Sequence, residues 1–204
     1  DVLGDYNKLV LDNWTGEYVE TGGFKVKGSL YLYGKSVPGE IKIEGGSDIN
    51  NANLFYDLYN QEVGLVVDNK FVGVDSKIES FKLGIPEAFG KGELLFKPTA
   101  NFTSPKRIKG YFNVVAENTG KYSFLRRFVA NIAPDPHNQM ASELRIFQQN
   151  IEYYIYNFKD KSLRKVQLRA KDITKAIPEA ASLANLKSFD LTTSAGVANL
   201  IQSL

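Results

Sequence analysis

Residues 19–46 read VETGGFKVKGSLYLYGKSVPGEIKIEGG and alternate apolar with polar side chains. Side chains of a β-strand point to opposite faces with a period of two, so the alternation predicts strands with one buried and one solvent-facing side. After short strands at Tyr6–Leu11 and Glu17–Val19, a longer strand is expected over Phe24–Tyr33, with Tyr31 and Tyr33 on its polar face. The pattern breaks at 37–39 and resumes at Ile41 and Ile43.

Further strand-sized runs follow at residues 63–74, 78–85, 90–96 and 108–115, with Gly, Pro and Asn between them. The first of these is a hairpin candidate, because two β-branched segments flank a short polar turn at residues 68–70. Short strands at such regular spacing are typical of a sandwich, a barrel or a β-solenoid. We therefore expect a mainly β fold, either β-solenoid-like or a sandwich.

The chain changes character after residue 120. Apolar residues at 124, 125, 128, 129 and 132 fall on one helical face, which predicts a helix over residues 122–132. Pro178 can begin another helical stretch, and Asp190 or Thr192 can cap a final helix over residues 193–204. We expect a single domain, 1–204, whose α-helices pack on the β structure mostly after residue 120 and define a helix-containing subregion, 120–204.

Residues 140–170 fit two patterns. Alternation at 151, 153 and 155 and at 166, 168 and 170, around a polar stretch at 159–162, predicts a hairpin. Apolar residues at 140, 144, 147, 151, 154 and 158 also fit one amphipathic helix from 140 to 158. Aromatic and β-branched enrichment favours strand for 151–158.

Charge is distributed unevenly along the chain. Residues 1–100 hold 10 basic and 15 acidic residues, a net charge of −5, and residues 101–204 hold 15 basic and 8 acidic residues, a net charge of +7. Such asymmetry indicates either an anionic partner or oppositely charged faces that meet within or between copies. No run of Lys or Arg exceeds two residues and aromatics are not interleaved with them, so no nucleic-acid partner is expected.

Recognisable catalytic motifs are missing from the sequence. His137 is the only histidine and lies in a proline-rich turn, there is no cysteine, and no Gly-x-Ser-x-Gly motif occurs. The carboxylate pairs Glu40 with Glu44 and Asp68 with Asp75 suit solvated strand faces and turns better than catalysis. We expect no enzyme activity, no metal, no cofactor and, because no apolar run approaches the ~20 residues that cross a bilayer, no membrane span.

Two further patterns bear on location and partners. The sequence begins at Asp1 rather than Met, which predicts a secreted protein or one in the secretory or vacuolar route. Asn13 and Asn101 stand in glycosylation sequons and are the glycosylation candidates. Exposed tyrosines suit contact with a second copy, and the candidates for such an assembly surface are Tyr31, Tyr33, Tyr153, Tyr154 and Tyr156.

The leading functional hypothesis is therefore a non-enzymatic structural, surface or storage protein that forms homo-oligomers or lattices through complementary charged and tyrosine-rich faces. The alternative is a carrier for an apolar small ligand. A carrier needs a continuous apolar cavity, for which the candidate lining residues are Phe24, Val26, Leu30, Leu65, Val67 and Phe81.

Parts of the first half carry a family pattern: Leu3–Leu11 (LGDYNKLVL), the glycine-punctuated strands of Val19–Gly34, and Val63–Leu83. These segments resemble the choice-of-anchor A group of secreted proteins, and Ala184–Leu204 resembles the helix that such domains lay along their strands. The resemblance implies an extracellular β-solenoid-like adhesion, coat or surface domain without catalytic residues. The chain departs from the pattern at Gly28, where the family has a glycine pair, and residues 97–175 have no counterpart.

The segment Trp14–Tyr18 (WTGEY) resembles the tryptophan that closes a lipocalin barrel. This likeness implies the apolar-ligand carrier. The order differs from the lipocalin pattern, in which Gly precedes Trp, and the paired cysteines common in lipocalins are missing from this sequence.

Overall fold

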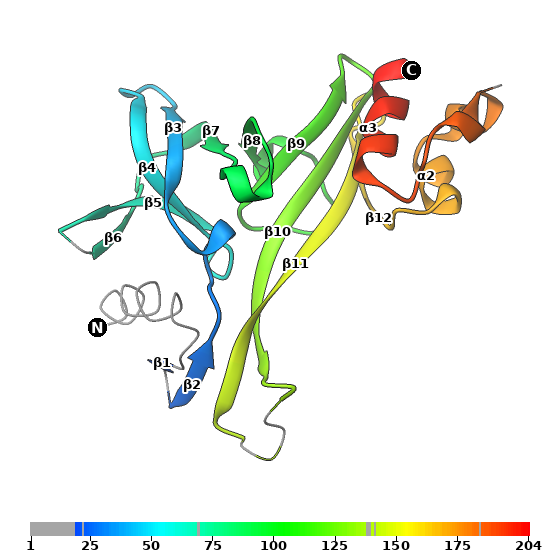
Figure 1. Cartoon of the computed structure of the whole chain (residues 1–204). Coiled ribbons are helices and arrows are strands. Elements are labelled where there is room, and N and C mark those ends of the chain that lie inside the picture. Colours follow the sequence, from blue (N-terminus) through cyan, green and yellow to red (C-terminus); the bar gives the residue numbers. More distant parts are fainter. Residues whose placement is uncertain (1–18, 22, 69, 138–139, 141, 184) are drawn as a thin grey trace. The chain divides into compact units, whose positions relative to one another are not determined.

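The computed structural model describes residues 19–204 except 22, 69, 138, 139, 141 and 184 (Figure 1). The described part of the chain holds twelve β-strands and two α-helices, and both helices lie after residue 120. Strand β2 pairs parallel with β11, the other pairings whose register is described are antiparallel, and the sheet is not a closed barrel. The prediction of a mainly β fold with helices packed on it after residue 120 is confirmed.

The structure divides into two compact units, each made of two chain segments. Unit 1 comprises residues 1–93 and 128–150, and unit 2 comprises residues 94–127 and 151–204. Strands β10 (Tyr122–Pro134) and β11 (Leu144–Asn157) each contribute one part to each unit. The described α-helices belong to unit 2.

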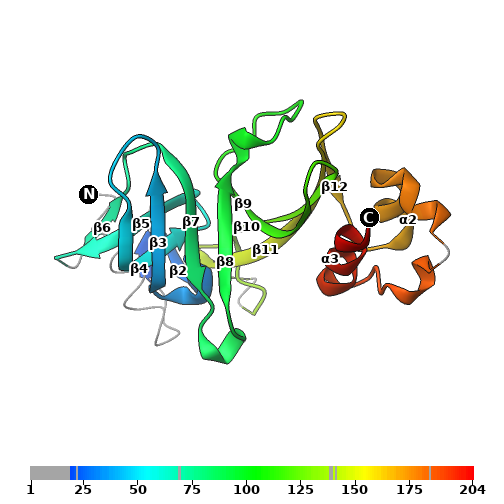
Figure 2. The same cartoon turned by 90° about the horizontal axis from the view of Figure 1, so that it is seen from above.

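Unit 1 is built from an antiparallel series in the order β7-β3-β4-β5-β6 (Figure 2). A separate short strand, β2, pairs antiparallel with β1 and parallel with residues 144–146 at the start of β11. The hairpin predicted for 63–74 is confirmed as β5 and β6, with residue 69 of its turn outside the described residues. The strands are β1 (Val19–Thr21), β2 (Phe24–Lys27), β3 (Val37–Ile43), β4 (Ile49–Asp57), β5 (Glu62–Val67), β6 (Lys70–Gly73) and β7 (Ile78–Gly84), and the 3-10 segments are η1 (Leu32–Gly34) and η2 (Glu87–Phe89).

Strand β2 ends at Lys27, earlier than the alternation over Phe24–Tyr33 predicts. Gly28 has φ of +91°, a conformation that side chains with a Cβ rarely adopt, and a Cβ there would lie 3.3 Å from the Phe147 carbonyl oxygen. The chain therefore turns after Lys27 and buries the next residues. Tyr31 is only 1% exposed and its ring centroid lies 4.8 Å from that of Phe55, so its predicted place on a polar strand face is wrong.

A tight turn follows β4 and is held by the buried carboxylate of Asp57. One of its oxygens accepts hydrogen bonds from the backbone N–H groups of Tyr59 and Asn60, each at 2.8 Å, and the other accepts from the Asn60 side-chain amide at 2.8 Å. Asp57 is 2% exposed. Burial raises the pKa of the Asp57 carboxyl above its usual value, although the bonds from Asn60 and Tyr59 oppose the rise.

Gln61, in the same turn, is buried and fully hydrogen-bonded through its side chain. Its amide nitrogen donates to the carbonyls of Leu58 at 2.7 Å and Phe128 at 2.9 Å, and its oxygen accepts from the Tyr56 hydroxyl at 2.9 Å. The backbone of Gln61 has φ of +62°. This side chain therefore ties the β4–β5 turn to the part of β10 that belongs to unit 1.

The raised pKa of Asp57 predicts a specific pH dependence of stability. Because the folded state holds this proton more tightly, the carboxyl stabilises the fold below the unfolded pKa of 3.8, and that contribution is lost as pH rises through the folded value. Asp57→Asn keeps an oxygen to accept the backbone N–H groups but buries no charge. We expect the unfolding free energy of Asp57→Asn, minus that of the wild type, to increase from about pH 4 to about pH 7 in urea titrations. A difference that stays constant with pH would contradict this account of the turn.

Unit 2 contains an antiparallel series in which β8 pairs with β9, β9 with the first part of β10, and the second part of β11 with β12. Helix α3 packs against β9 (Figure 1). The strands are β8 (Glu93–Pro98, whose first residue falls in unit 1), β9 (Tyr111–Asn118) and β12 (Ser162–Val166), the helices are α2 (Ala170–Ala176) and α3 (Ser194–Ser203), and the 3-10 segments are η3 (Thr99–Asn101), η4 (Pro178–Ser182) and η5 (Leu186–Ser188).

The helix predicted for residues 122–132 is wrong, because this segment is the strand β10. Phe124 and Leu125 are both completely buried, in two different hydrophobic clusters, so the apolar residues at even and odd positions serve the two faces of a strand. Residues 122–126 pair antiparallel with β9, with a β-bulge between Phe124 and Leu125. Pairing with a neighbouring strand therefore outweighs the helical spacing of the apolar residues.

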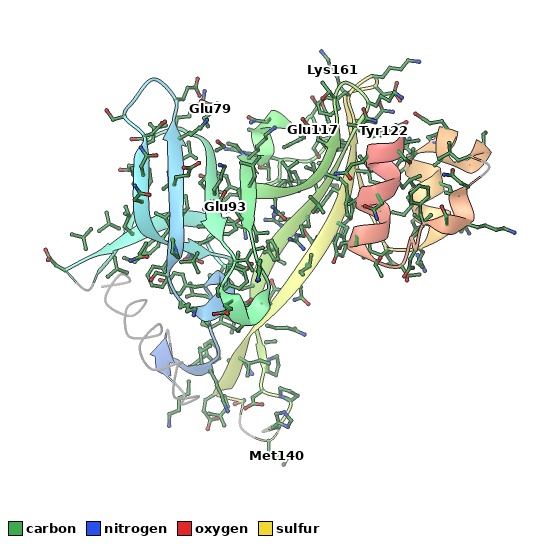
Figure 3. The ribbon with its side chains drawn as sticks, turned by 45° about the horizontal axis from the view of Figure 1, so that its top comes forward. Glu79, Glu93, Glu117, Tyr122, Met140 and Lys161 are labelled. Carbon is green, nitrogen blue, oxygen red and sulfur yellow. The ribbon has the colours of Figure 1, made fainter. Side chains whose placement is uncertain are left out.

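The hairpin predicted for residues 151–170 is confirmed at its centre, where β11 and β12 pair from Tyr153 with Val166 to Asn157 with Ser162. The competing helix over 140–158 is wrong. Met140 lies fully exposed in the loop between β10 and β11, and Figure 3 shows Met140 at the tip of that loop and Lys161 at the β11–β12 turn.

The helices of unit 2 cover a hydrophobic core. Ile173 of α2 and Val197, Leu200 and Ile201 of α3 are completely buried in one cluster. Helix α3 begins at a cap formed by Thr193, whose hydroxyl accepts from the backbone N–H of Gly196 at 3.1 Å. The predicted final helix is confirmed, but the cap is neither Asp190 nor Thr192. Their side chains bond one another, since a carboxylate oxygen of Asp190 accepts from the backbone and hydroxyl of Thr192.

Candidate functional site

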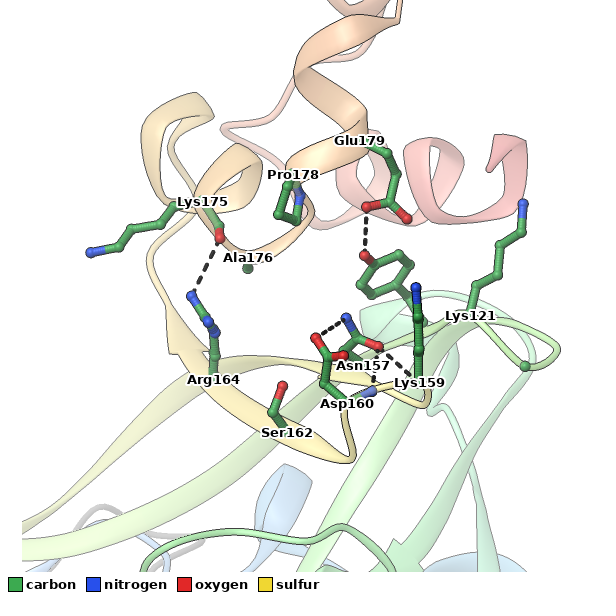
Figure 4. Close-up of a pocket in the computed structure, with 12 residues that line it drawn as sticks. Lys121, Asn157, Lys159, Asp160, Ser162, Arg164, Lys175, Ala176, Pro178 and Glu179 are labelled. Atoms are coloured by element: carbon green, nitrogen blue, oxygen red, sulfur yellow. Dashed lines mark hydrogen bonds between the residues drawn. The ribbon is translucent and has the colours of Figure 1, made fainter.

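A cleft of about 320 Å³ opens in unit 2 between the β11–β12 turn and the segment that runs from α2 into η4 (Figure 4). Tyr122 and Lys121, at the start of β10, line it from a third direction. Both carboxylates and cations line the cleft: the acidic residues are Asp160 and Glu179, and the basic ones are Lys121, Lys159, Arg164 and Lys175.

The two carboxylates of this cleft already accept hydrogen bonds from neutral side chains. Glu179 accepts from the Tyr122 hydroxyl at 2.7 Å, and Asp160 accepts from the side-chain amide of Asn157 at 3.2 Å. Burial and the bond to Glu179 raise the pKa of the Tyr122 hydroxyl well above its usual range, so the phenol stays protonated and keeps donating.

The cations of the cleft have weaker partners. Arg164 donates to the backbone carbonyl of Lys175 at 3.4 Å, and Lys121 donates to the carbonyl of Leu204. Within the described part of the chain, no carboxylate forms an ion pair with Arg164, Lys159 or Lys175. All three side chains belong to solvent-exposed residues. With four cations and two carboxylates among its lining residues, the cleft carries a net positive charge.

A second cleft, of about 540 Å³, adjoins the first and shares Arg164, Lys175 and Ala176 with it. The other cations of this second cleft are paired. Arg169 and Asp172 form an ion pair at 2.8 Å, and Lys165 pairs with Glu152. Arg164 and Lys175 therefore lie where the two hollows meet.

Glu152 is the centre of a charged network on β11. It accepts from Arg127 at 3.1 Å, from the Tyr154 hydroxyl at 3.0 Å and from Lys165. Burial acts to raise the pKa of Glu152, but the hydrogen bonds from these three donors outweigh it and lower the pKa. Burial and the Glu152 charge raise the pKa of Tyr154 to about 12. These groups support the strand beside the second cleft.

The five tyrosines predicted from the sequence to form an assembly surface do not form an exposed surface. Tyr31, Tyr154 and Tyr156 are at most 7% exposed, so the prediction that they belong to an assembly surface is wrong. Tyr154 and Tyr156 lie in an aromatic core, with ring centroids 4.9 Å from Phe112 and 5.3 Å from Phe102 respectively. The two that are half-buried also contact rings: Tyr33 contacts Phe89 and Tyr153 stacks on Phe124.

The residues proposed to line an apolar cavity do not enclose one space. Phe24 is 40% exposed and Val67 is 51% exposed, so both face solvent. Val26 and Leu30 are buried in one packed cluster, and Phe81 packs edge to face on Tyr56 with ring centroids 5.4 Å apart. The apolar-ligand carrier stays a prediction that no contact in the described residues favours.

Other sequence candidates are placed as follows. His137 is exposed in the loop after β10, and its backbone N–H donates to Asp135 at 2.9 Å. Asn101 is exposed at the end of η3, so its glycosylation stays a prediction, and Asn13 lies outside the described residues. Glu40 and Glu44 form exposed ion pairs with lysines.

The described residues include no group of three or more His, Asp or Glu side chains placed to hold a metal ion. No described helix is long and apolar enough to cross a membrane.

The basic cleft was not predicted from the sequence, although a signal for it exists. Residues 159–175 hold seven basic residues and only two acidic ones. Hairpin and helix bring three of them, Lys159, Arg164 and Lys175, to one cleft. A count of charge in short windows would have found the segment, but not which of its cations lack a carboxylate.

Comparisons of the chain with protein-family models, with characterised proteins and with solved structures found no match. The resemblances to the choice-of-anchor A group and to lipocalins stay predictions from the segments that carry them.

Proposed function

We propose that the protein is a non-enzymatic structural, surface or storage protein whose copies associate through oppositely charged units. The observation that carries this proposal is the charge of the two compact units. Unit 1 holds 10 basic and 17 acidic residues, a net charge of −7, and unit 2 holds 15 basic and 6 acidic residues, a net charge of +9. The asymmetry is larger than that between the halves of the sequence, −5 and +7.

Opposite charge on two units of one chain favours contact between unit 1 of one copy and unit 2 of the next. Such a contact is head-to-tail, and it closes into a ring or continues as a filament according to its rotation. Complementary potentials also speed the encounter of the two surfaces and disfavour contact between like units. The charges thus support an association with a defined direction.

Unit 1 also offers apolar area for such a contact. The β5–β6 hairpin exposes Val66 by 41%, Val67 by 51% and Val72 by 46%, and β6 is the last strand in the pairing order of the sheet. Exposed apolar side chains on an edge hairpin are typical of surfaces that contact another chain. This hairpin, and not a tyrosine-rich face, supplies the apolar contact area, because Tyr31, Tyr154 and Tyr156 are buried.

The proposal predicts self-association that weakens as salt rises. Sedimentation velocity at several protein concentrations should show oligomers at about 0.01 M salt, where the Debye length is about 30 Å, and mostly monomer at about 1 M salt, where it is about 3 Å. A chain that remains monomeric at low salt and high concentration contradicts the proposal.

Charge reversal in the two units provides a matched test, because the same substitution should have opposite effects. Lys106, Lys171 and Lys187 are exposed in unit 2, and changing all three to Glu lowers its net charge from +9 to +3 and should abolish association at low salt. Lys42→Glu with Lys91→Glu, both exposed in unit 1, makes that unit more acidic and should preserve or strengthen association. If both sets of substitutions weaken self-association equally, the sign of the charge on each unit does not determine association, which contradicts the proposal.

A further inference from the structure

From the cleft of unit 2 we infer a function separate from self-association: it is a binding site for a small ligand that carries two linked phosphate groups. Three cations, Lys159, Arg164 and Lys175, line the cleft and have no carboxylate partner within the described residues. The acids beside them are already hydrogen-bonded, Glu179 to Tyr122 and Asp160 to Asn157. With Lys121, the cleft holds four cations against these two carboxylates, so an incoming anion meets a net positive charge.

The residue types suit phosphate in particular. The planar guanidinium of Arg164 offers five N–H donors and can bind two oxygens of one phosphate group at once. Its one hydrogen bond with the described residues, at 3.4 Å to a backbone carbonyl, leaves most of these donors available. Lys159 and Lys175 add flexible ammonium groups from the hairpin turn and from α2. In Figure 4 the Lys175 side chain extends away from Arg164, so its ammonium group must rotate toward the cleft to contact a ligand there.

The presence of two adjoining clefts indicates a ligand with two anionic groups. Arg164 and Lys175 line both hollows, so each can contact a group on either side of their junction. The first hollow adds Lys159, and the second adds Arg169 and Lys165, which are held by Asp172 and Glu152. The first cleft, at about 320 Å³, lies within the size range of small-ligand sites.

The ligand chemistry has two sources, free pyrophosphate and a nucleoside diphosphate, and both are used as probes. The full chain is titrated at low salt with inorganic phosphate, pyrophosphate or ADP, and binding is measured by calorimetry and by the rise in unfolding temperature. Saturable binding of pyrophosphate or ADP, at least about tenfold tighter than phosphate, is expected. Tighter binding of ADP than pyrophosphate would assign the nucleotide as the source, and the reverse order the free anion.

Variants separate a site from diffuse attraction to a basic unit. Arg164→Gln and Lys175→Gln should each weaken pyrophosphate binding by about tenfold or more, since each removes a charged donor at the junction. Lys187→Gln removes the same charge from an exposed position of unit 2 that does not line either cleft, and it should leave binding within about twofold of the wild type. Circular dichroism confirms that each variant is folded.

Three results would overturn the inference: no saturable binding at low salt, phosphate and pyrophosphate binding with equal affinity, or a loss in Lys187→Gln as large as in Arg164→Gln. None of these results depends on whether the chain self-associates, because binding can be measured at protein concentrations at which it is monomeric.

Discussion

Gly196→Ala should destabilise the protein by about 3 kcal/mol or more. Gly196 lies in the first turn of α3, and a Cβ added there would overlap the carbonyl oxygen of Asp190 and lie 2.9 Å from its nitrogen. Backbone atoms cannot rotate out of the way, so the helix itself must move. Because Val197, Leu200 and Ile201 of the same helix are completely buried, that movement also disturbs the core of unit 2.

Urea unfolding followed by circular dichroism measures this loss, and Gly73→Ala is the matched control. Gly73 lies at the exposed end of β6, has no positive φ, and its nearest neighbour to an added Cβ is 3.8 Å away. The same substitution there should change the unfolding free energy by no more than about 0.5 kcal/mol. Equal effects of the two changes would mean that α3 is not held against Asp190 as the structure shows.

The second large effect is expected for Gln61→Ala, at about 2–4 kcal/mol. The substitution removes three side-chain hydrogen bonds, to Leu58, to Phe128 and from Tyr56, in a place where Gln61 is only 5% exposed. Each bond contributes about 1 kcal/mol, and buried groups that lose a partner also bear a desolvation cost. Thermal and urea unfolding of the full chain provide the measurement.

Two companion variants distinguish side-chain bonding from backbone conformation. Gln61→Gly relieves the cost of φ at +62° but still removes the bonds, so it should remain clearly less stable than the wild type. Gln148→Ala, at an exposed position of β11, should have little effect. If Gln61→Gly equals or exceeds the wild type in stability, the hydrogen bonds of Gln61 contribute nothing measurable.

Strict alternation was a reliable predictor where both faces of a strand differ in polarity. It identified β3 around Ile41 and Ile43 and the β11–β12 hairpin, while β-branched segments around a polar turn identified the β5–β6 hairpin. Helical spacing gave the wrong element at residues 122–132, since apolar residues at both even and odd positions satisfy a helical face as well as a strand. The alternation also predicts a strand that continues past Gly28, where a backbone turn instead ends β2 and places Tyr31 in the core.

The candidate site was harder to predict for a physical reason. Lys159 and Arg164 stand on a hairpin and Lys175 on a helix, and only the fold decides that all three line one cleft. Whether a cation is neutralised depends on partners such as Glu152, which pairs with Lys165 and leaves its neighbour Arg164 without a carboxylate. The sequence shows which residues are charged, but it does not show which of them form ion pairs.

The interleaving of the two units has a consequence for the order in which the chain can fold as it is synthesised. Unit 1 needs residues 128–150 to be complete, so the 57 residues 94–150 must be made after its first segment ends. At roughly 5–20 residues per second, the ribosome takes about 3 to 11 s to make them. During that interval β2 has no parallel partner, since Lys25 pairs with Leu144. Pairing across so long a stretch slows folding and leaves a nascent strand edge open, so we expect this protein to be a client of chaperones during translation.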